Sequence, residues 1–194
     1  EPTFASRAVA VIAEVIEAMG GRTLCLFTSH AAMRAAAEVL RAMVPYPILC
    51  QGDADRAELL ARFREEEESV LLGTGSFWQG VDVAGPSLSC VIIERLPFGV
   101  PDDPVQRARH AQAERAGLSP LWALSLPEAV VRFRQGVGRL IRCRRDRGLL
   151  VILDPRVRTR RYGRVFLESI EGFQPVASLE QAATLLGLRE GKTA

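Results

Sequence analysis

Lysine is almost absent from this chain, because Lys192 is the single lysine among 25 lysine and arginine residues. Arginine therefore supplies nearly all of the positive charge. Such one-sided usage looks like a coding bias. The presence of arginine in place of lysine at a given position is consequently weak evidence for bidentate phosphate binding.

Membrane and export signals are missing as well. No apolar run approaches the ~20 residues of a membrane-spanning helix. The first residues do not show a basic stretch followed by a short apolar block, so we expect no signal peptide. These features predict a cytoplasmic protein with no membrane partner.

The four cysteines form no C-x-x-C pair, which argues against a zinc site or a metal cluster within the chain. Cys25, Cys50 and Cys90 sit in apolar, strand-like runs, whereas Cys143 follows an arginine. We expect the first three to be buried thiols in a reducing compartment.

A phosphate-binding P-loop is also missing. Gly191-Lys192-Thr193 resembles the end of the pattern G-x-x-x-x-G-K-[ST], but the first glycine of that pattern would fall on Leu186. No strand precedes this segment. The chain therefore lacks a phosphate cradle of its own.

What the sequence does contain is an alternation of apolar strands and amphipathic helices. With 194 residues, 48% of them hydrophobic, the chain is long enough for one domain with a real core. Continuous apolar strands joined by helices predict an α/β domain with a parallel sheet covered on both faces. The expected strands are 23–27, 47–50, 69–73, 88–96 and 149–153, and the expected helices are 7–19, 33–43, 51–63, 104–116 and 127–143, with two more after Asp154.

The helix expected over 127–143 has two chemically opposite faces. Arg132, Gln135, Arg139 and Arg142 fall within about 80° of one another. The opposite face is apolar and consists of Val130, Phe133, Val137, Leu140 and Ile141. Gly136 and Gly138 each weaken a helix by up to ~1 kcal/mol, and Gly138 lies beside the arginines as if something approached the backbone there. The pattern favours a phosphate-facing helix over a merely solvated basic one.

Charge is distributed unevenly along the chain. Residues 132–164 contain twelve arginines and two aspartates, a balance of +10, so the remainder sums to −8 for the net charge of +2. A basic segment on a slightly acidic body suggests a polyanionic partner, either a nucleotide or a nucleic acid.

Polar residues follow the first three expected strands, at Thr28-Ser29-His30, at Gln51-Gly52 and over 74–82. Ligands of parallel sheets bind beyond the carboxyl ends of the strands. Hydroxyls and backbone N–H groups there can bind phosphates. Phe77 and Trp78 are adjacent in a loop, so one ring could stack on a base; alternatively, both wedge the loop onto the domain. His30 could instead be a capping or surface histidine, and Asp82 a loop-capping residue. His110 is expected at the surface.

These segments together resemble the second motor domain of superfamily 2 DNA helicases of the DinG/XPD group. Residues 24–30 look like helicase motif IV, residues 75–82 like motif V and residues 135–142 like motif VI. Arg95-Leu96-Pro97-Phe98 and Asp154-Pro155-Arg156 also fit the DinG pattern. The resemblance implies a RecA-like three-layer fold with a central, mostly parallel sheet. It implies one domain over residues 1–194, excised from a longer protein, with a leading helix over 1–20 and C-terminal helices over 157–194.

The resemblance also implies half of an ATP-driven translocase that separates duplex strands 5′ to 3′. ATP and Mg²⁺ would lie between this domain and a first motor domain, so the isolated chain should be inactive. Arg142 would be the arginine finger, with Arg139 beside it. The resemblance further implies ATP and interdomain contacts from Gln135, Gly138, Gly80 and Asp82. The single-stranded DNA surface would comprise Thr28, Ser29, His30, Gln51, Thr74, Gly75, Ser76 and Trp78.

Two points qualify the resemblance. Gln79 stands where DinG-like proteins usually have glutamate, which removes a negative charge. The iron–sulfur cluster of many relatives belongs to the first motor domain, and this sequence does not indicate whether one accompanies it.

Two other functions remain open from the sequence. One is a non-enzymatic nucleic-acid-binding module, and the other a RecA-like nucleotide-binding domain with a metabolic substrate. The pair Arg139 and Arg142 with Gln135 favours the helicase, because a pure binding module needs no arginine finger.

Overall fold

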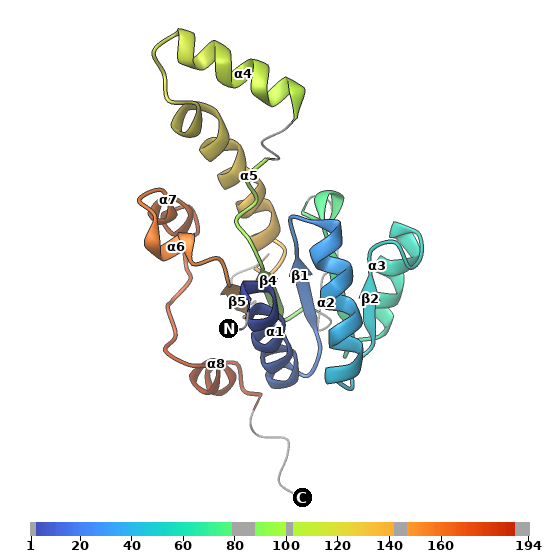
Figure 1. The fold of residues 1–194 in the computed structure, drawn as a ribbon. Coiled ribbons are helices and arrows are strands. Elements are labelled where there is room, and N and C mark those ends of the chain that lie inside the picture. Colours follow the sequence, from blue (N-terminus) through green and yellow to red (C-terminus); the bar gives the residue numbers. More distant parts are fainter. Residues whose placement is uncertain (1–2, 79–87, 100–102, 142–146, 189–194) are drawn as a thin grey trace, which may run out of the picture.

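A computed structural model of the chain describes residues 3–78, 88–99, 103–141 and 147–188. Its centre is a five-stranded sheet in the order β2-β3-β1-β4-β5 (Figure 1). Every pairing in this sheet is parallel, which confirms the predicted α/β class. The strands are β1 (Thr23–Leu26), β2 (Ile48–Cys50), β3 (Val70–Gly73), β4 (Cys90–Ile93) and β5 (Leu149–Ile152).

Helices cover both faces of the sheet. The helices of the described residues are α1 (Phe4–Met19), α2 (His30–Met43), α3 (Arg56–Glu65), α4 (Pro104–Arg115), α5 (Leu126–Val137), α6 (Arg156–Thr159), α7 (Gly163–Glu168) and α8 (Leu179–Leu185). A 3-10 turn, η1 (Gly75–Phe77), follows β3, and a π-helical segment, η2 (Leu121–Ser125), precedes α5. No helix among the described residues is long and apolar enough to cross a membrane.

The core consists of two apolar layers separated by the sheet. Alternate strand side chains point to opposite faces. Leu24 and Leu26 of β1 therefore pack with residues of α3, α5 and α7, whereas Cys25 and Phe27 pack with residues of α1, α2 and α8. This alternation explains why the strands read as continuous apolar runs.

The three cysteines expected in the core are buried free thiols, as predicted. Burial raises the pKa of Cys90 to about 12, so this thiol stays protonated at neutral pH. Burial also raises the pKa of Cys25.

Two helices begin at residues that differ from the predicted ones. α2 begins at His30 rather than at residue 33, because the Ser29 hydroxyl accepts a hydrogen bond from the backbone N–H of Ala32. α3 begins at Arg56 rather than at residue 51, because the carboxylate of Asp55 accepts one from the N–H of Glu58. The residues before Asp55 form a turn instead.

Helix α5 ends at Val137, six residues before the predicted end at Cys143. Gly138 caps the helix, and its N–H donates to the carbonyl of Arg134. The chain then turns through Leu140, which is buried, while Ile141 is exposed and does not join the predicted apolar face.

The structure gives Gly136 a packing role. A Cβ atom at this position would lie 2.8 Å from Cδ1 of Leu26 and 3.0 Å from Cε3 of Trp78. Only glycine therefore lets α5 approach β1 and the segment after β3 this closely.

Helix α4 and η2 form an arm that projects beyond the carboxyl ends of the strands (Figure 1). Ala113 is the one buried residue of α4. The carboxylate of Glu128 on α5 accepts hydrogen bonds from Arg109 (2.6 Å) and Gln106 (3.2 Å), which hold the arm together. His110, expected at the surface, is half-buried, and its Nε2 atom lies 3.0 Å from the hydroxyl of Ser125.

The close packing around Gly136 leads to a prediction about the stability of a variant at this position. Gly136→Ala should lower the free energy of unfolding by ~1–2 kcal/mol, because overpacking outweighs the better helix propensity of alanine. Urea denaturation followed by circular dichroism measures this difference. Gly99→Ala is the control, since a Cβ there would meet nothing closer than 3.8 Å. Equal stability of the Gly136 variant and the wild type would contradict the close packing of α5.

Candidate nucleic-acid interface

Three predicted site residues meet at the carboxyl ends of β1, β2 and β3. The strands are in register, so Leu26 lies opposite both Gly73 and Ile93. The backbone N–H of Thr74 donates to Oε1 of Gln51 at 2.7 Å, and the Thr74 hydroxyl donates to the same oxygen at 3.2 Å. Nε2 of His30 lies 3.0 Å from that hydroxyl. We call His30, Gln51 and Thr74 the strand-end cluster.

Other predicted residues surround the strand-end cluster on the surface. Thr28, Ser29, Gly75 and Ser76 are exposed, whereas Thr74 is buried. Ser29 caps α2, so its hydroxyl has a structural partner. Gly75 has a φ of +40°, a conformation that glycine adopts more easily than other residues. The residues around the strand-end cluster therefore present small polar groups and backbone to the solvent.

The structure corrects the prediction that Trp78 belongs to the DNA surface. Its side chain is only 4% exposed, and Nε1 donates to the carbonyl of Phe27 at 2.9 Å. Phe77 is buried as well, on Gly73, whose missing Cβ leaves room for the ring. Both adjacent rings are therefore buried at the end of the 3-10 turn. Trp78 is thus a core residue and cannot stack on a base in this conformation.

Arg34 is a neighbour of the cluster that sequence reasoning missed. It lies on α2 one turn after His30, and its guanidinium lies beside Gly52. The available signal was the i, i+4 spacing, which puts both residues on one helix face. Within the described part of the chain, the Arg34 side chain has no hydrogen bond or ion pair.

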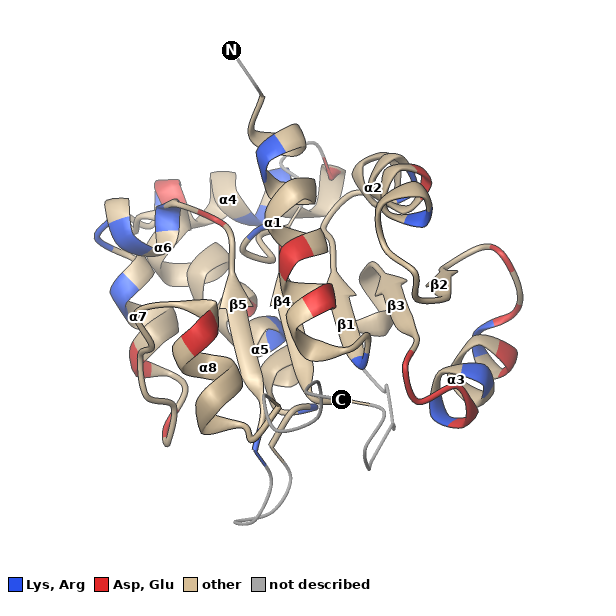
Figure 2. Cartoon of the chain, turned by 90° about the horizontal axis from the view of Figure 1, so that it is seen from below, with Lys and Arg blue, Asp and Glu red and all other residues tan. Residues whose placement is uncertain are grey.

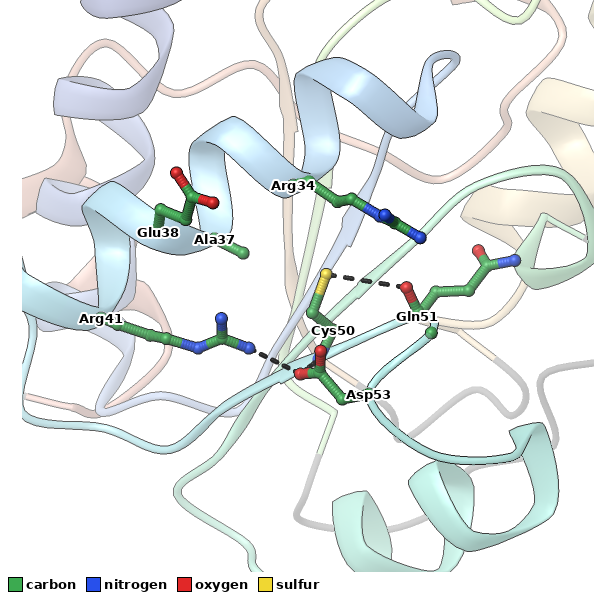
Figure 3. A pocket seen from close by; sticks show the side chains of 8 residues that line it. Arg34, Ala37, Glu38, Arg41, Cys50, Gln51 and Asp53 are labelled. Atoms are coloured by element: carbon green, nitrogen blue, oxygen red, sulfur yellow. Dashed lines mark hydrogen bonds and ion pairs between the residues drawn. The ribbon is translucent and has the colours of Figure 1, made fainter.

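Arg34 borders an open pocket of about 230 Å³ between α2 and the turn after β2 (Figure 3). Arg41 lies on the same side of α2, but it is neutralised by Asp53 at 2.6 Å. Figure 3 shows the Arg34 side chain extended toward Gln51. Burial raises the pKa of the Cys50 thiol in this pocket, and Asp53 raises it further.

A second group of predicted residues lies at the end of α5. Gln135 is half-buried, and its Oε1 atom is enclosed without a hydrogen-bond partner in the described structure. Nε of the half-buried Arg139 donates to the backbone carbonyl of Gln135 at 3.2 Å. Gly138 is exposed between them. The predicted residues Arg142, Gly80 and Asp82, together with Gln79, lie outside the described residues.

Asp154 fixes the segments that follow β4 and β5. This fully buried carboxylate accepts hydrogen bonds from the backbone N–H of Leu96 at 2.9 Å and from Nη2 of Arg156 at 2.6 Å. Burial alone would raise the pKa of Asp154. The hydrogen bonds from Arg156 and from the two backbone N–H groups outweigh this effect and lower it. The sequence pattern contained Asp154, but it did not reveal this role.

Metal-binding groups do not stand out in the part of the chain that the structure covers. No group of three or more His, Cys, Asp or Glu residues there could hold a metal ion.

The parallel sheet, its helical layers and the polar strand ends define a RecA-like motor domain. Residues 12–173 match the family described as "Helicase C-terminal domain", and the chain belongs to this family. More narrowly, it is a C-terminal motor domain of the DinG type.

The relatives support this assignment. The chain is 43% identical over 188 residues to "ATP-dependent DNA helicase YoaA" of Escherichia coli, an alignment that covers 97% of this chain and 30% of that protein. It is 43% identical over 175 residues to "ATP-dependent helicase DinG" of Mycobacterium tuberculosis, covering 90% and 26%. The chain thus spans about a third or less of these relatives.

Among solved structures, "XPD_APO" is similar with a TM-score of 0.62 and 17% identity, covering 88% of this chain and 36% of that one. At this identity the similarity concerns the fold, and it agrees with the predicted three-layer RecA-like architecture.

Because the pKa of Asp154 is lowered in the folded protein, the free energy of unfolding should depend on pH in the acidic range. Its ionised form contributes stability above the unfolded pKa of about 3.9, and this contribution is lost as pH falls through the lower folded pKa. The urea midpoint of the wild type should therefore fall more steeply below pH 4 than that of Asp154→Asn. At pH 7 the variant should be less stable.

Asp53→Asn is the control for this comparison, because it removes an exposed ion pair and should change the urea midpoint at pH 7 little. Parallel pH profiles for the wild type and Asp154→Asn would contradict the role of Asp154.

Proposed function

We propose that the chain is the second motor domain of an ATP-dependent DNA helicase that moves 5′ to 3′. In this proposal residues 1–194 form one domain of a longer protein, with a leading helix over 1–20 and C-terminal helices over 157–194. The domain contributes an arginine finger to a shared ATP site and a surface that binds the backbone of single-stranded DNA.

The observation that carries the nucleotide half is the incomplete polar site at the end of α5. A buried oxygen without a partner is rare in folded proteins, and Oε1 of Gln135 is such an atom within the described structure. Arg139, beside it, has its Nε on a backbone carbonyl and no ion pair with a described residue. In this proposal, a group outside the described residues, on the nucleotide or on the first motor domain, completes this site.

ATP and Mg²⁺ would be held mainly by the first motor domain, because this chain has no P-loop. Arg142 would reach the γ-phosphate, where a guanidinium stabilises charge that develops in the transition state. Arg139, Gln135, Gly138, Gly80 and Asp82 would support phosphate and interdomain contacts. The isolated chain should accordingly not hydrolyse ATP.

The strand-end cluster would bind the DNA backbone. Small hydroxyls, exposed backbone at Gly75 and an unneutralised arginine suit phosphate groups, and contacts of this kind carry no base sequence. Arg34 adds the positive charge that the predicted residues lacked. We therefore add Arg34 to Thr28, Ser29, His30, Gln51, Thr74, Gly75 and Ser76, and we assign Trp78 to the core beneath them.

Arg34 and Arg41 provide a matched test of this surface in the 194-residue chain. Arg34→Gln should weaken binding to fluorescein-labelled oligothymidine severalfold at low salt. It should also reduce the slope of log affinity against log salt by about 0.7, the value for one phosphate contact on a single strand. Fluorescence anisotropy measures both quantities.

Arg41→Gln removes the same net charge, but Arg41 is already paired with Asp53, so its effect should stay below about twofold. Thr74 is itself buried, so Thr74→Val should weaken binding indirectly, through loss of the hydroxyl contacts that position His30 and Gln51. Equal losses of DNA affinity for Arg34→Gln and Arg41→Gln would mean that only net charge matters, and would contradict a specific contact at Arg34.

Arg142 tests the nucleotide half in the full-length protein. Arg142→Ala should lower DNA-stimulated ATP hydrolysis by roughly 10³–10⁵-fold while ATP and DNA still bind, because an arginine finger acts on the chemical step. Arg142→Lys should rescue little, since lysine cannot present the planar guanidinium. Steady-state ATPase and strand-separation assays measure the outcome.

Arg132→Ala is the control, because Arg132 contacts the carbonyl of Pro97 and should cost less than about tenfold in rate. If Arg139→Ala abolished turnover while Arg142→Ala did not, Arg139 would be the finger. If neither variant affected turnover, the shared ATP site would be wrong. Turnover by the isolated chain would favour an autonomous enzyme.

A further inference from the structure

The two tryptophans of the chain have opposite environments. Trp78 is 4% exposed and belongs to the core, whereas Trp122 is 45% exposed on η2 of the arm. A large aromatic side chain that stays in contact with water forgoes the stabilisation that burial gives. The ring available for stacking is therefore Trp122, not the Trp78 that the sequence suggested.

An arginine lies beside the Trp122 ring, and two more are exposed in the same segment of the chain. Cζ of Arg161 lies 6.0 Å from the centroid of the Trp122 ring, within the range of a cation–π contact. Arg158 and Arg160 are exposed in the same short segment. Neither side chain has an ion pair or hydrogen bond with a described residue. Figure 2 shows the arginine-bearing parts of α6 and of the turn before α7 on one side of the molecule.

Neighbouring Arg164 differs from these three arginines. Its guanidinium is paired with Glu168 one helical turn later, so its charge is largely compensated. The segment over 158–161 thus keeps three guanidiniums without an acidic partner among the described residues, and Arg161 lies next to the exposed Trp122 ring. Aromatic faces combined with arginines are the groups with which proteins bind single-stranded nucleic acids.

The position of this surface fits the strand-end cluster. α6 follows β5 directly, at the carboxyl end of the sheet, where the strand-end cluster also lies. In the sheet order, β5 is three strands from β3, which corresponds to about 14 Å at the usual strand spacing. Trp122 and the arginines therefore lie near the β5 end of the carboxyl edge of the sheet, whereas the strand-end cluster lies near β3 on that edge.

We propose that Trp122, with Arg158, Arg160 and Arg161, forms a second contact for single-stranded nucleic acid. A base stacks on the exposed face of Trp122, and the arginines meet the flanking phosphates. The inference rests on the proposed nucleic-acid binding of this domain and extends it to residues outside the helicase-like motifs. Three uncompensated guanidiniums favour a polyphosphate over an apolar protein surface.

Tryptophan fluorescence of the 194-residue chain tests the stacking directly. Oligothymidine of about 20 nucleotides, longer than the ~4–16-nucleotide sites of common single-strand binders, should quench the emission and shield Trp122 from iodide. Buried Trp78 should respond little to iodide. Trp122→Phe should abolish the DNA-dependent signal while anisotropy shows nearly unchanged affinity, because phenylalanine still stacks.

Affinity measurements separate the ring from the charges. Trp122→Ala should weaken binding by about 5- to 150-fold, the range for loss of one stacked base. Replacing Arg158, Arg160 and Arg161 together by glutamine should reduce the salt slope by about 2, whereas Arg164→Gln should leave it unchanged. Thermal melting should show that all these variants stay folded, since every replaced side chain is at least partly exposed.

The outcomes distinguish this inference from the proposed function. If Arg34→Gln and Thr74→Val weaken binding while Trp122 gives no DNA-dependent signal and Trp122→Ala binds normally, the second contact is wrong and the first stands. If oligothymidine does not bind at all, both are wrong. If polyglutamate shields Trp122 as well as oligothymidine does, the surface recognises acidic protein and the nucleic-acid assignment is overturned.

Discussion

The packing of Trp78 between three elements is the interaction on which the arrangement of both candidate sites depends. Its indole N–H is bonded to the carbonyl of Phe27, at the end of β1, and its ring lies against Gly136 of α5. The segment that begins at Thr74 is thereby joined both to the first strand and to the helix that carries Gln135. A side chain at position 136 would separate these elements. The geometry of the strand-end cluster and that of the α5 terminus consequently depend on one contact.

This contact has a consequence for how a motor could work. Thr74 lies in the segment that leads to Trp78. Gln135 directly precedes Gly136, the residue of α5 that lies against the Trp78 ring. A displacement of α5 would be transmitted to the strand-end cluster through packed atoms, because well-packed interiors deform little. The proposed nucleotide and DNA surfaces are therefore physically contiguous, although their residues lie far apart in the sequence. Asp154 adds rigidity on the other side by holding the segments after β4 and β5 together.

Periodicity predicted the fold well, because each expected strand contains an observed one; β1 to β4 are fully buried, whereas the edge strand β5 is half-buried after Leu149. Periodicity failed where the end of a helix or the burial of a side chain depends on a single contact. Leu140 and Ile141 continue the apolar pattern of α5, yet the helix ends at Val137, and the hydrophobicity of the sequence does not show where it ends. The meeting of His30, Gln51 and Thr74 was predictable from the rule on strand ends. The sequence left the burial of Trp78 open as an alternative to base stacking, because the choice depends on Phe27 and Gly136, which are distant in the sequence. Arg34 was missed for a similar reason, since its role depends on Gly52.

Arginine content is a poor guide in this chain, and the pairing of each arginine is a better one. Arg41 and Arg164 face Asp53 and Glu168, so water and carboxylates already satisfy them. Arg34, Arg158 and Arg160 have no such partner among the described residues, and each lies near the carboxyl edge of the sheet or on the segment that follows it. A phosphate brought to a paired guanidinium must first compete with a carboxylate, whereas a phosphate brought to an unpaired one displaces only water. Where arginine is the default basic residue, the absence of an acidic neighbour therefore marks the positions at which an external anion is the stronger partner.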